Sequence, residues 1–312
     1  MTYVHREVPL ISVCVCTYKR PTMLFDLLAG LVCQEHSEFL YEIIVVDNDS
    51  AGSAREIVNL FKTSNPDLAL HYAIEPQSGI SHARNRTVAM SQGEFLAFID
   101  DDESVPPNWL TNLLHCMVHS KADAVFGPVL PIFPPLSKNW AISGRFFESS
   151  RFADLTRIHS DHSRTGNSMV RAIWARTRIC APFDVRLANS GGEDYDFFAW
   201  VESNQGILVW SEHAVVSEFV PLERQEVGFL LKRSYRTSIV YWRRQNAKRA
   251  AYLAIVEAIR GLGGGTICML FGVLLLPTGL ANSIRLWCRG MNGFGRVMAL
   301  TNVHPIAYGS TV

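Results

Sequence analysis

The N-terminal part of the chain alternates between short apolar runs and longer segments of mixed polarity. Four runs rich in β-branched and aromatic side chains have the pattern of buried strands: residues 10–16, 42–47, 70–74 and 95–99. The segments between them are expected to be helices: residues 23–31, 53–62 and 81–90. Strands that alternate with helices over short connections favour an α/β fold with a doubly wound, mostly parallel sheet.

The same alternation continues at longer intervals. We expect a helix at 109–119, strands at 122–130 and 207–210, and a return to the sheet at 165–170. Residues 131–164 mix prolines with aromatic side chains such as Trp140 and Phe146. Connections this long are usually functional or disordered, so this one is expected to be a binding loop or a packed hydrophobic flap.

The C-terminal part has a different character. Residues 229–249 combine Lys and Arg with aromatic and aliphatic residues, which predicts a basic amphipathic helix. Between Gly261 and Ile284 there are 24 residues without a charge, enough to cross a bilayer. Glycines and Pro277 interrupt this run, so an interfacial or re-entrant hairpin is an equal alternative to a span. A pair of helices buried in a soluble fold is the third reading.

The charge of the chain is divided between its two ends. The 312 residues have a net charge of zero, yet residues 226–312 hold eleven Lys and Arg against two Asp and Glu. We therefore expect two regions, an α/β domain over 1–225 and a basic, apolar, helical region over 226–312. A basic region needs an anionic partner, and because this one is also apolar, a membrane surface is expected and nucleic acid is not.

The seven cysteines are scattered along the chain, with no C-x-x-C pair. Cys14 and Cys16 lie two apart on an expected strand, so they share one face and do not have the spacing of a zinc site. No signal-peptide pattern is recognised at the start, and reduced cytosolic thiols are expected.

Acidic side chains follow two of the expected strands. The strand at 95–99 is followed by Asp100, Asp101, Asp102 and Glu103, and the strand at 42–47 ends at Asp47, with Asp49 close behind. The carboxyl edge of a parallel sheet is where ligands bind, and clustered carboxylates there suit Mg²⁺ or Mn²⁺. A solvated acidic turn or a helix N-terminus would explain the same acidic run.

Five short motifs together resemble the family 2 glycosyltransferases, which have the Rossmann-like GT-A fold. The motifs are Cys16-Thr-Tyr-Lys-Arg-Pro21, Val45-Val-Asp-Asn-Asp-Ser50, Ala83-Arg-Asn85, Asp100-Asp-Asp102 and Gly191-Gly-Glu-Asp194. Each is weak alone, but all five stand in the order of the family. The resemblance covers roughly residues 10–240 and is strongest to bacterial exopolysaccharide glucosyltransferases of the succinoglycan type.

The resemblance implies a site for a nucleotide-sugar donor, a UDP-sugar by preference, and a divalent cation. Asp102, with Asp100, would bind the metal. The implied donor-binding residues are Thr17, Tyr18, Asp47, Asp49, Arg84, Asp100, Asp101, Arg233 and Arg236. For Arg84, a salt bridge on a helix surface is an equal alternative.

The resemblance also implies an inverting transfer in which Asp194 is the general base. Ser190-Gly-Gly-Glu193 has the form of a capping box, so residues 193–200 are expected to open a helix, and acids that merely complement its dipole are the alternative. The expected acceptor-binding residues are Trp109, Asn167 and Glu193. The acceptor would be a polyprenyl-diphosphate-linked saccharide, presented at the cytoplasmic face of the plasma membrane, where the C-terminal region attaches peripherally or by one span.

One position departs from the family pattern. The family often places a metal-binding histidine where this chain has Ser217, and the nearest histidine is His213. Two other functions share parts of the pattern. A nucleotidyltransferase would carry a glycine-rich loop after the first strand, which residues 17–21 lack, and a non-catalytic membrane-bound synthase subunit would not need Asp194.

Overall fold

The computed structural model describes residues 8–247 and 249–301. The chain forms two compact units, each built from more than one segment. Unit 1 consists of the chain up to Leu130, Ser149–Asn189 and Glu193–Glu218. Unit 2 consists of Pro131–Glu148, Ser190–Gly192 and the chain from Phe219 onward. The division therefore differs from the expected boundary after residue 225, because two inner segments join the C-terminal helices.

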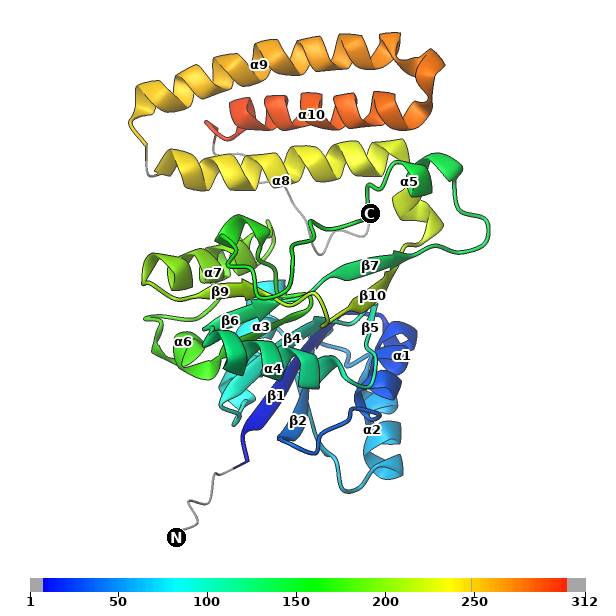
Figure 1. The fold of residues 1–312 in the computed structure, drawn as a ribbon, viewed down its shortest axis with the longest axis vertical. Helices are drawn as coiled ribbons and strands as arrows, with labels where there is room; N and C mark the ends of the chain where they lie inside the picture. The colour runs from blue at the N-terminus through cyan, green and yellow to red at the C-terminus, as the bar shows by residue number, and fades with distance from the viewer. Residues whose placement is uncertain (1–7, 248, 302–312) are drawn as a thin grey trace. The chain divides into compact units, whose positions relative to one another are not determined.

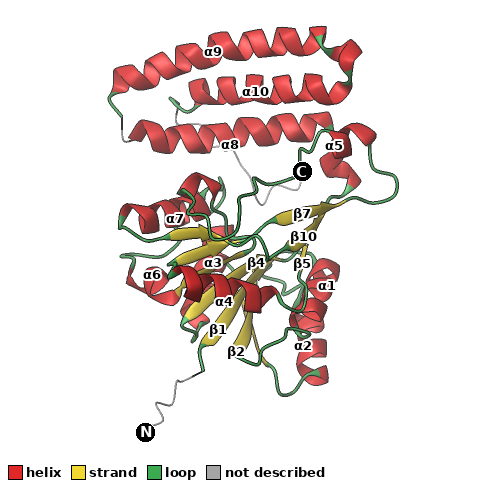
Figure 2. Ribbon diagram, in the orientation of Figure 1, coloured by secondary structure: helices red, strands yellow, loops and turns green. Residues whose placement is uncertain are grey.

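The core of unit 1 is a seven-stranded sheet in the order β3-β2-β1-β4-β8-β6-β9 (Figures 1 and 2). Its strands are β1 (Leu10–Thr17), β2 (Leu40–Asp47), β3 (Ala69–Ile74), β4 (Phe95–Asp100), β6 (Ala124–Phe126), β8 (Ser168–Arg171) and β9 (Leu208–Trp210). All pairs are parallel except those of β8, which runs antiparallel to β4 and β6. The expected mostly parallel sheet is confirmed.

Helices cover both faces of this sheet. The helices of unit 1 are α1 (Pro21–Leu31), α2 (Arg55–Ser64), α3 (Ile80–Met90), α4 (Trp109–Ser120), α6 (Ala172–Thr177) and α7 (Glu193–Ser203), with short 3₁₀ helices η1 (Ser160–His162) and η2 (Val185–Leu187). Apolar residues of α1, α2 and α4 share one core, and those of α3, α6 and α7 share others. Successive side chains of a strand point to opposite faces, so Val13 enters one core and Cys14 another. Two-sided burial explains why these strands are continuous apolar runs.

The register of the central strands brings their polar ends to one edge. Thr17 of β1 lies opposite Asp47 of β2, and Cys16 lies opposite Asp100 of β4. The acidic ends of β2 and β4 are more than fifty residues apart in the sequence. In the sheet, only β1 lies between them.

The expected strand at 122–130 is two strands. It breaks at Gly127-Pro128, because proline has no N–H with which to continue a ladder. The second piece, β7 (Val129–Ile132), belongs to a small sheet in the order β5-β10-β7, with β5 (Glu103–Ser104) and β10 (Val216–Phe219). This sheet holds the end of the acidic run in place.

The long connection at 131–164 divides between the two units. Its first part contains α5 (Asn139–Ser143) and belongs to unit 2, where the Arg233 guanidinium donates to the carbonyl of Phe146 at 2.6 Å and lies over the ring of Phe147. Packing of this kind fits the hydrophobic flap rather than an open loop.

The C-terminal helices of unit 2 run alongside one another, with α10 between α8 and α9 (Figure 1). The elements are η3 (Leu222–Gln225), α8 (Val227–Ala247), α9 (Ala251–Leu274), η4 (Leu276–Thr278) and α10 (Leu280–Met298). The uncharged run from Gly261 to Ile284 is therefore not one helix, since it turns at η4 and Gly279. Within the described residues, α9 alone is both long and apolar enough to cross a membrane.

Candidate active site

Asp101, in the middle of the acidic run, connects the loop that follows β4 to the loop that follows β1. Its carboxylate is buried and accepts hydrogen bonds from Thr17 Oγ1 at 2.8 Å and from Arg20 Nη1 at 3.0 Å. Burial raises the pKa of Asp101 to about 6, although Arg20 and the bond from Thr17 act to lower it. Thr17 is thus held inside the loop, whereas Tyr18, the next residue, is exposed. Arg20, which the sequence analysis did not single out, also pairs with Asp102 at 3.2 Å.

Asp47 and Asp49 have different environments. Asp47 is fully buried and accepts bonds from the backbone N–H groups of Asp49 and Ala54 and from the Tyr72 hydroxyl, at 2.8–3.0 Å. Asp49 retains 8% of its surface and accepts from the N–H of Ala51 at 3.2 Å. Asp47 therefore shapes the loop after β2, and Asp49 is the one of the two with surface for a ligand.

Arg84 lies in the interior, so the surface salt bridge considered for it is wrong. Its side chain is 8% exposed, its Nη1 pairs with Glu193, and its Nη2 lies 3.4 Å from Asp100 Oδ1. Burial alone would lower the pKa of Arg84, but Glu193, Asp100 and Asp194 together raise it by more. Arg84 is a fixed cation that joins the end of β4 to the start of α7.

The start of α7 differs from the expected capping box. The helix begins at Glu193, as expected, but Gly191 and Gly192 have φ values of +79° and +91° and are not the first helical residues that a capping box at Ser190 would need. The Glu193 side chain turns to Arg84 instead of back to the N-cap, and its Oε2 is buried without a hydrogen-bond partner. Burial raises the pKa of Glu193 to about 7, against the opposing effect of Arg84. Glu193 is enclosed, which does not support its expected contact with an acceptor.

The other two acids of α7 separate into two roles. Asp196 pairs with Arg178 at 2.6 Å, an ion pair within the body of unit 1. Asp194 is only half-buried, and its Oδ1 accepts the N–H of Tyr195 at 2.7 Å. The residue before it, Glu193, pairs with Arg84, and Arg84 Nη2 lies 3.4 Å from Asp100 Oδ1. Asp194 therefore belongs with Arg84, Asp100, Asp101 and Asp102, a group that we call the strand-end cluster.

The carboxylates of Asp100 and Asp102 fit a divalent cation. The Asp100 side chain is 47% exposed and that of Asp102 10%. Partial loss of hydration and the charge of Asp102 raise the pKa of Asp100, although Arg84 opposes the shift, so negative charge is crowded here. No group of three or more His, Cys, Asp or Glu in the described part of the chain could hold a metal by itself. Mg²⁺ and Mn²⁺ are commonly bound by one or two carboxylates with phosphates and waters, which agrees with this partial set.

The surroundings of the acidic run contain residues that the sequence analysis missed. Ser217 and Glu218 of β10 pair with Ser104 and Glu103, so the position where the family often has histidine does lie beside the acids. His213 is elsewhere, with Nε2 4.0 Å from Asp154. Arg164 acts on the pKa values of Asp100 and Glu103 and has a buried Nη2 without a hydrogen-bond partner. Arg164 belongs to no sequence motif. The one signal in the sequence is that it directly precedes the segment expected to return to the sheet.

The expected acceptor contacts Trp109 and Asn167 are in the interior. Neither side chain has exposed surface, and Trp109 Nε1 donates to Asn167 Oδ1 at 2.8 Å. The Asn167 amide donates to the carbonyls of Pro128 and Ala214. Their contact with an acceptor has no support here, because both side chains are used to join segments of the core.

Arg233 and Arg236 belong to α8 in unit 2, whereas the strand-end cluster belongs to unit 1. Arg233 is engaged with Phe146 and Phe147 of its own unit, and Arg236 is half-buried there. Their role at the donor stays a prediction.

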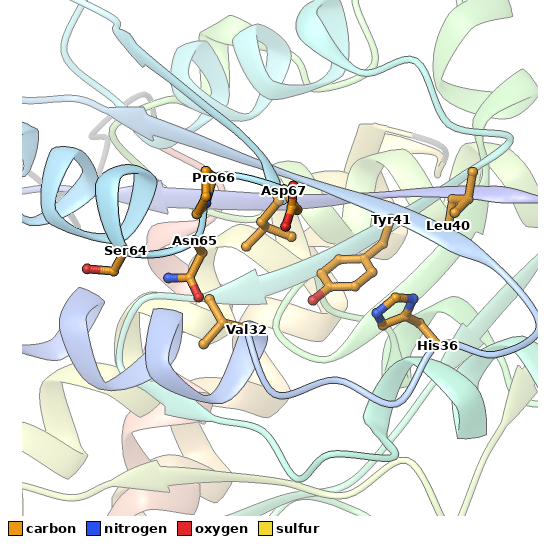
Figure 3. A pocket seen from close by; sticks show the side chains of 9 residues that line it. Val32, His36, Leu40, Tyr41, Ser64, Asn65, Pro66 and Asp67 are labelled. Carbon is orange, nitrogen blue, oxygen red and sulfur yellow. The ribbon is translucent and has the colours of Figure 1, made fainter.

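A pocket of about 400 Å³ lies at the other edge of the sheet (Figure 3). It is lined by Val32, His36, Leu40, Tyr41, Ser64, Asn65, Pro66, Asp67 and Leu68. These residues lie at or before the starts of β2 and β3, whereas the acids lie at or after the ends of β2 and β4, so the pocket is separate from the cluster. It contains none of the expected site residues.

Sequence comparisons connect the chain to known proteins. A profile described as "Glycosyl transferase family 2" matches residues 12–180. The chain is 36% identical over 235 residues to the succinoglycan biosynthesis protein ExoM of Rhizobium meliloti, covering 75% of this chain and 74% of that protein. It is 31% identical over 126 residues to the glycosyltransferase AglE of Haloferax volcanii, covering 40% of this chain and 41% of that one.

Two solved structures are similar in fold. The mannosyltransferase PcManGT of Pyrobaculum calidifontis, in complex with GDP-Man and Mn²⁺, matches with a TM-score of 0.64 at 16% identity, over 95% of this chain and 88% of that chain. S. aureus TarS 1–349, in complex with UDP-GlcNAc, matches with a TM-score of 0.51 at 15% identity, over 91% of both chains. At these identities the likeness extends to the fold.

Proposed function

Because the chain belongs to glycosyltransferase family 2 and has the GT-A fold, we propose that it transfers a sugar from a nucleotide-sugar to a lipid-linked saccharide. The donor is a UDP-sugar, with UDP-glucose as the first to test, and the transfer inverts the anomeric carbon. The product enters the assembly of a cell-surface or exopolysaccharide. The relation to a succinoglycan biosynthesis protein supports this assignment.

The donor half of the proposal rests on the carboxyl edge of the sheet. Asp49 would meet the base, and Asp100 and Asp102 would hold Mg²⁺ or Mn²⁺ near the diphosphate. When bound, the cation would neutralise the charge that develops on the leaving diphosphate. Arg84 and Arg164 add fixed positive charge at the same edge. Relatives in fold that were solved with GDP-Man and Mn²⁺ or with UDP-GlcNAc support a donor of this class.

The chemical step is assigned to Asp194. Its carboxylate would accept the proton of an acceptor hydroxyl as that oxygen attacks the anomeric carbon from the face opposite the diphosphate. One displacement of this kind inverts the configuration, so an α-linked donor gives a β-linked product. Arg84 would keep Glu193, and with it the first turn of α7, beside Asp100.

A lipid-linked acceptor explains the C-terminal region. An enzyme that acts on a polyprenyl-diphosphate-linked saccharide must work at a membrane surface, and unit 2 combines a positive charge with the apolar helix α9. We assign the protein to the cytoplasmic face of the plasma membrane, where nucleotide-sugars are made available.

The observation that carries the proposal is that Arg84 joins Asp100 to Glu193, the residue before Asp194, within unit 1. The test is to incubate membranes that contain the protein with radiolabelled nucleotide-sugars and to extract the lipid fraction. Metal-dependent labelling of lipid by one UDP-sugar is expected. Labelling that persists unchanged in the Asp194→Asn variant would favour a non-catalytic subunit, and release of pyrophosphate from a nucleoside triphosphate would favour a nucleotidyltransferase.

A further inference from the structure

The helix α9 buries its smallest side chains and exposes its largest. The residues of α9 that are buried are Ala254, Ala258, Gly261, Gly265 and Gly272. At 100° per residue these five positions form one stripe along the helix. The stripe faces α10, because Gly261, Gly265 and Gly272 each lie against residues of α10.

The glycines of this stripe permit close approach of the two backbones. A Cβ on Gly261 would lie 2.5 Å from the carbonyl oxygen of Gly293, and one on Gly265 would lie 2.9 Å from that of Gly290. Small residues at a helix interface with close backbone contact are typical of helices that pack in lipid. In water such a contact buries little apolar surface, so it is a weak reason for two helices to associate.

The opposite face of α9 is mainly apolar, and Arg260, 70% exposed, is the charged residue on that side. The large apolar residues exposed there are Tyr252, Leu253, Ile255, Val256, Ile259, Leu262, Ile267, Leu270, Phe271, Val273 and Leu274. The charged residues of α9 are Glu257 and Arg260, and they pair with each other at 3.0 Å. Soluble proteins rarely expose an apolar surface this continuous.

The companion helix α10 decides how α9 can enter a membrane. It runs beside α9 and carries Arg285 and Arg289 as exposed residues, while Arg296 pairs with Glu257 at 3.0 Å. If the hairpin crossed the bilayer, these arginines would have to enter the hydrocarbon, which is costly. If α9 lies parallel to the surface, its outward face meets the acyl chains and the arginines stay at the level of the headgroups.

We propose that α9 lies in the plane of an anionic lipid bilayer, with its outward face inserted and the basic residues of unit 2 on the headgroups. The proposal specifies the membrane attachment proposed above, but it does not depend on the transferase activity. Charge complementarity supports this partner, since residues 226–312 hold eleven basic and two acidic residues. The alternative cover for the same face is a second copy of the chain.

The first test uses the full-length protein and vesicles of phosphatidylcholine with or without phosphatidylglycerol. Leu270 and Leu274 are 63% and 68% exposed, so Leu270→Glu and Leu274→Glu should fold normally. Each should weaken flotation with the anionic vesicles by about tenfold or more. The matched control is Leu60→Glu on α2, 52% exposed in unit 1, which should bind as the unaltered protein does.

The second test measures depth. Fluorophores are attached to cysteines placed at Ile259 and Leu270, with the exposed Cys33 and Cys180 replaced by serine. These positions are eleven residues apart, about 16 Å along a helix. For an in-plane helix, lipids that carry a shallow quencher should quench both labels alike. A label at 270 reached only by a deep quencher would show a crossing or steeply inserted hairpin and overturn the proposal.

Two further results would also overturn it. Vesicle binding that is unaffected by Leu270→Glu would mean that another surface meets the lipid. Absence of vesicle binding, together with a dimer that dissociates on Leu270→Glu, would mean that a second copy covers this face. Vesicle binding as expected but with no sugar transfer would count against the proposed function alone.

Discussion

At the scale of single residues, carboxylates of the same type divide into those used by the fold and those left for chemistry. Asp47, Asp101 and Asp196 are each engaged by several hydrogen bonds or by an arginine. Asp100 keeps 47% of its side chain exposed and Asp194 is half-buried, so both have surface left for a ligand. A polar group that is already satisfied inside the protein gains little from a ligand, so the second pair is where a reaction is expected.

Asp194→Asn is the direct test of the base. We expect kcat to fall by ~10²–10⁴-fold, the usual loss for a general base, with the donor Kd nearly unchanged. The matched control is Asp196→Asn on the same helix, which breaks the pair with Arg178 and should lower Tm more than kcat. If the control is inactive and Asp194→Asn is active, the base has been assigned to the wrong carboxylate.

Asp102→Asn tests the metal. Asp100 and Asp102 are the two carboxylates proposed to bind the metal. Removing one of them should abolish turnover and remove the dependence of nucleotide binding on Mg²⁺ or Mn²⁺. Isothermal titration with UDP, with the metal and with EDTA, measures the second effect, and the unaltered protein gives the reference. Full activity of the variant in EDTA would contradict the metal site.

Glu193 provides a pH test. Because burial raises its pKa to about 7 from 4.5, the folded protein holds this proton more tightly than the unfolded chain does. Its contribution to stability is therefore complete below about pH 4.5 and is lost as the pH rises through 7. Between these pH values, titration of Glu193 should lower the Tm of the unaltered protein. In Glu193→Gln, this part of the decrease in Tm should be absent.

The same variant should also affect catalysis. Glu193→Gln removes the charge that holds Arg84, and a misplaced reacting group can cost up to ~10²-fold in rate, so kcat should fall at pH 8. Glu193→Asp, which keeps the charge, should recover part of the activity. Unchanged kcat in Glu193→Gln would show that the ion pair does not position the site.

At the scale of elements, the start of α7 depends on glycine. Gly192 belongs to unit 2, has a φ of +91°, and would place a Cβ 2.3 Å from Val240 Cγ1 of α8. The next residues in the chain are Glu193 and Asp194. The backbone that leads into the proposed base is therefore fixed by packing against α8 within unit 2.

Gly192→Ala should lower both Tm and kcat, because a side chain there is strained by its φ and collides with Val240. Val240→Ala removes the colliding atom, so the double variant should regain part of the loss, with a residual cost of about 1 kcal/mol from the φ value. Val240→Ala alone is the control. A double variant no better than Gly192→Ala would mean that contact with Val240 is not the cause.

At the scale of the whole chain, the charge is separated between the two units. The region from residue 226 carries nine more positive than negative charges, and its uncharged run adds an apolar contribution to membrane binding. Salt screens the electrostatic part only. The protein should therefore remain with isolated membranes in 1 M NaCl and leave them in detergent. Complete release by salt would limit the attachment to electrostatics.

The sequence by itself determined the local elements and the family. Strands such as 95–99 could be recognised because burial on both faces leaves an unbroken apolar run, and the acids that follow had to reach one sheet edge because parallel strands end together. Motif order was enough to identify glycosyltransferase family 2.

Only the tertiary structure decided which of these residues are available. Arg84 could be a surface or a buried cation until Glu193, more than a hundred residues later, was seen beside it. Trp109 and Asn167 have polar groups suited to binding, but each satisfies the other inside the core. The outward face of α9 likewise depends on which stripe α10 covers. Burial and pairing are set by neighbours distant in sequence, and a local pattern contains no information about them.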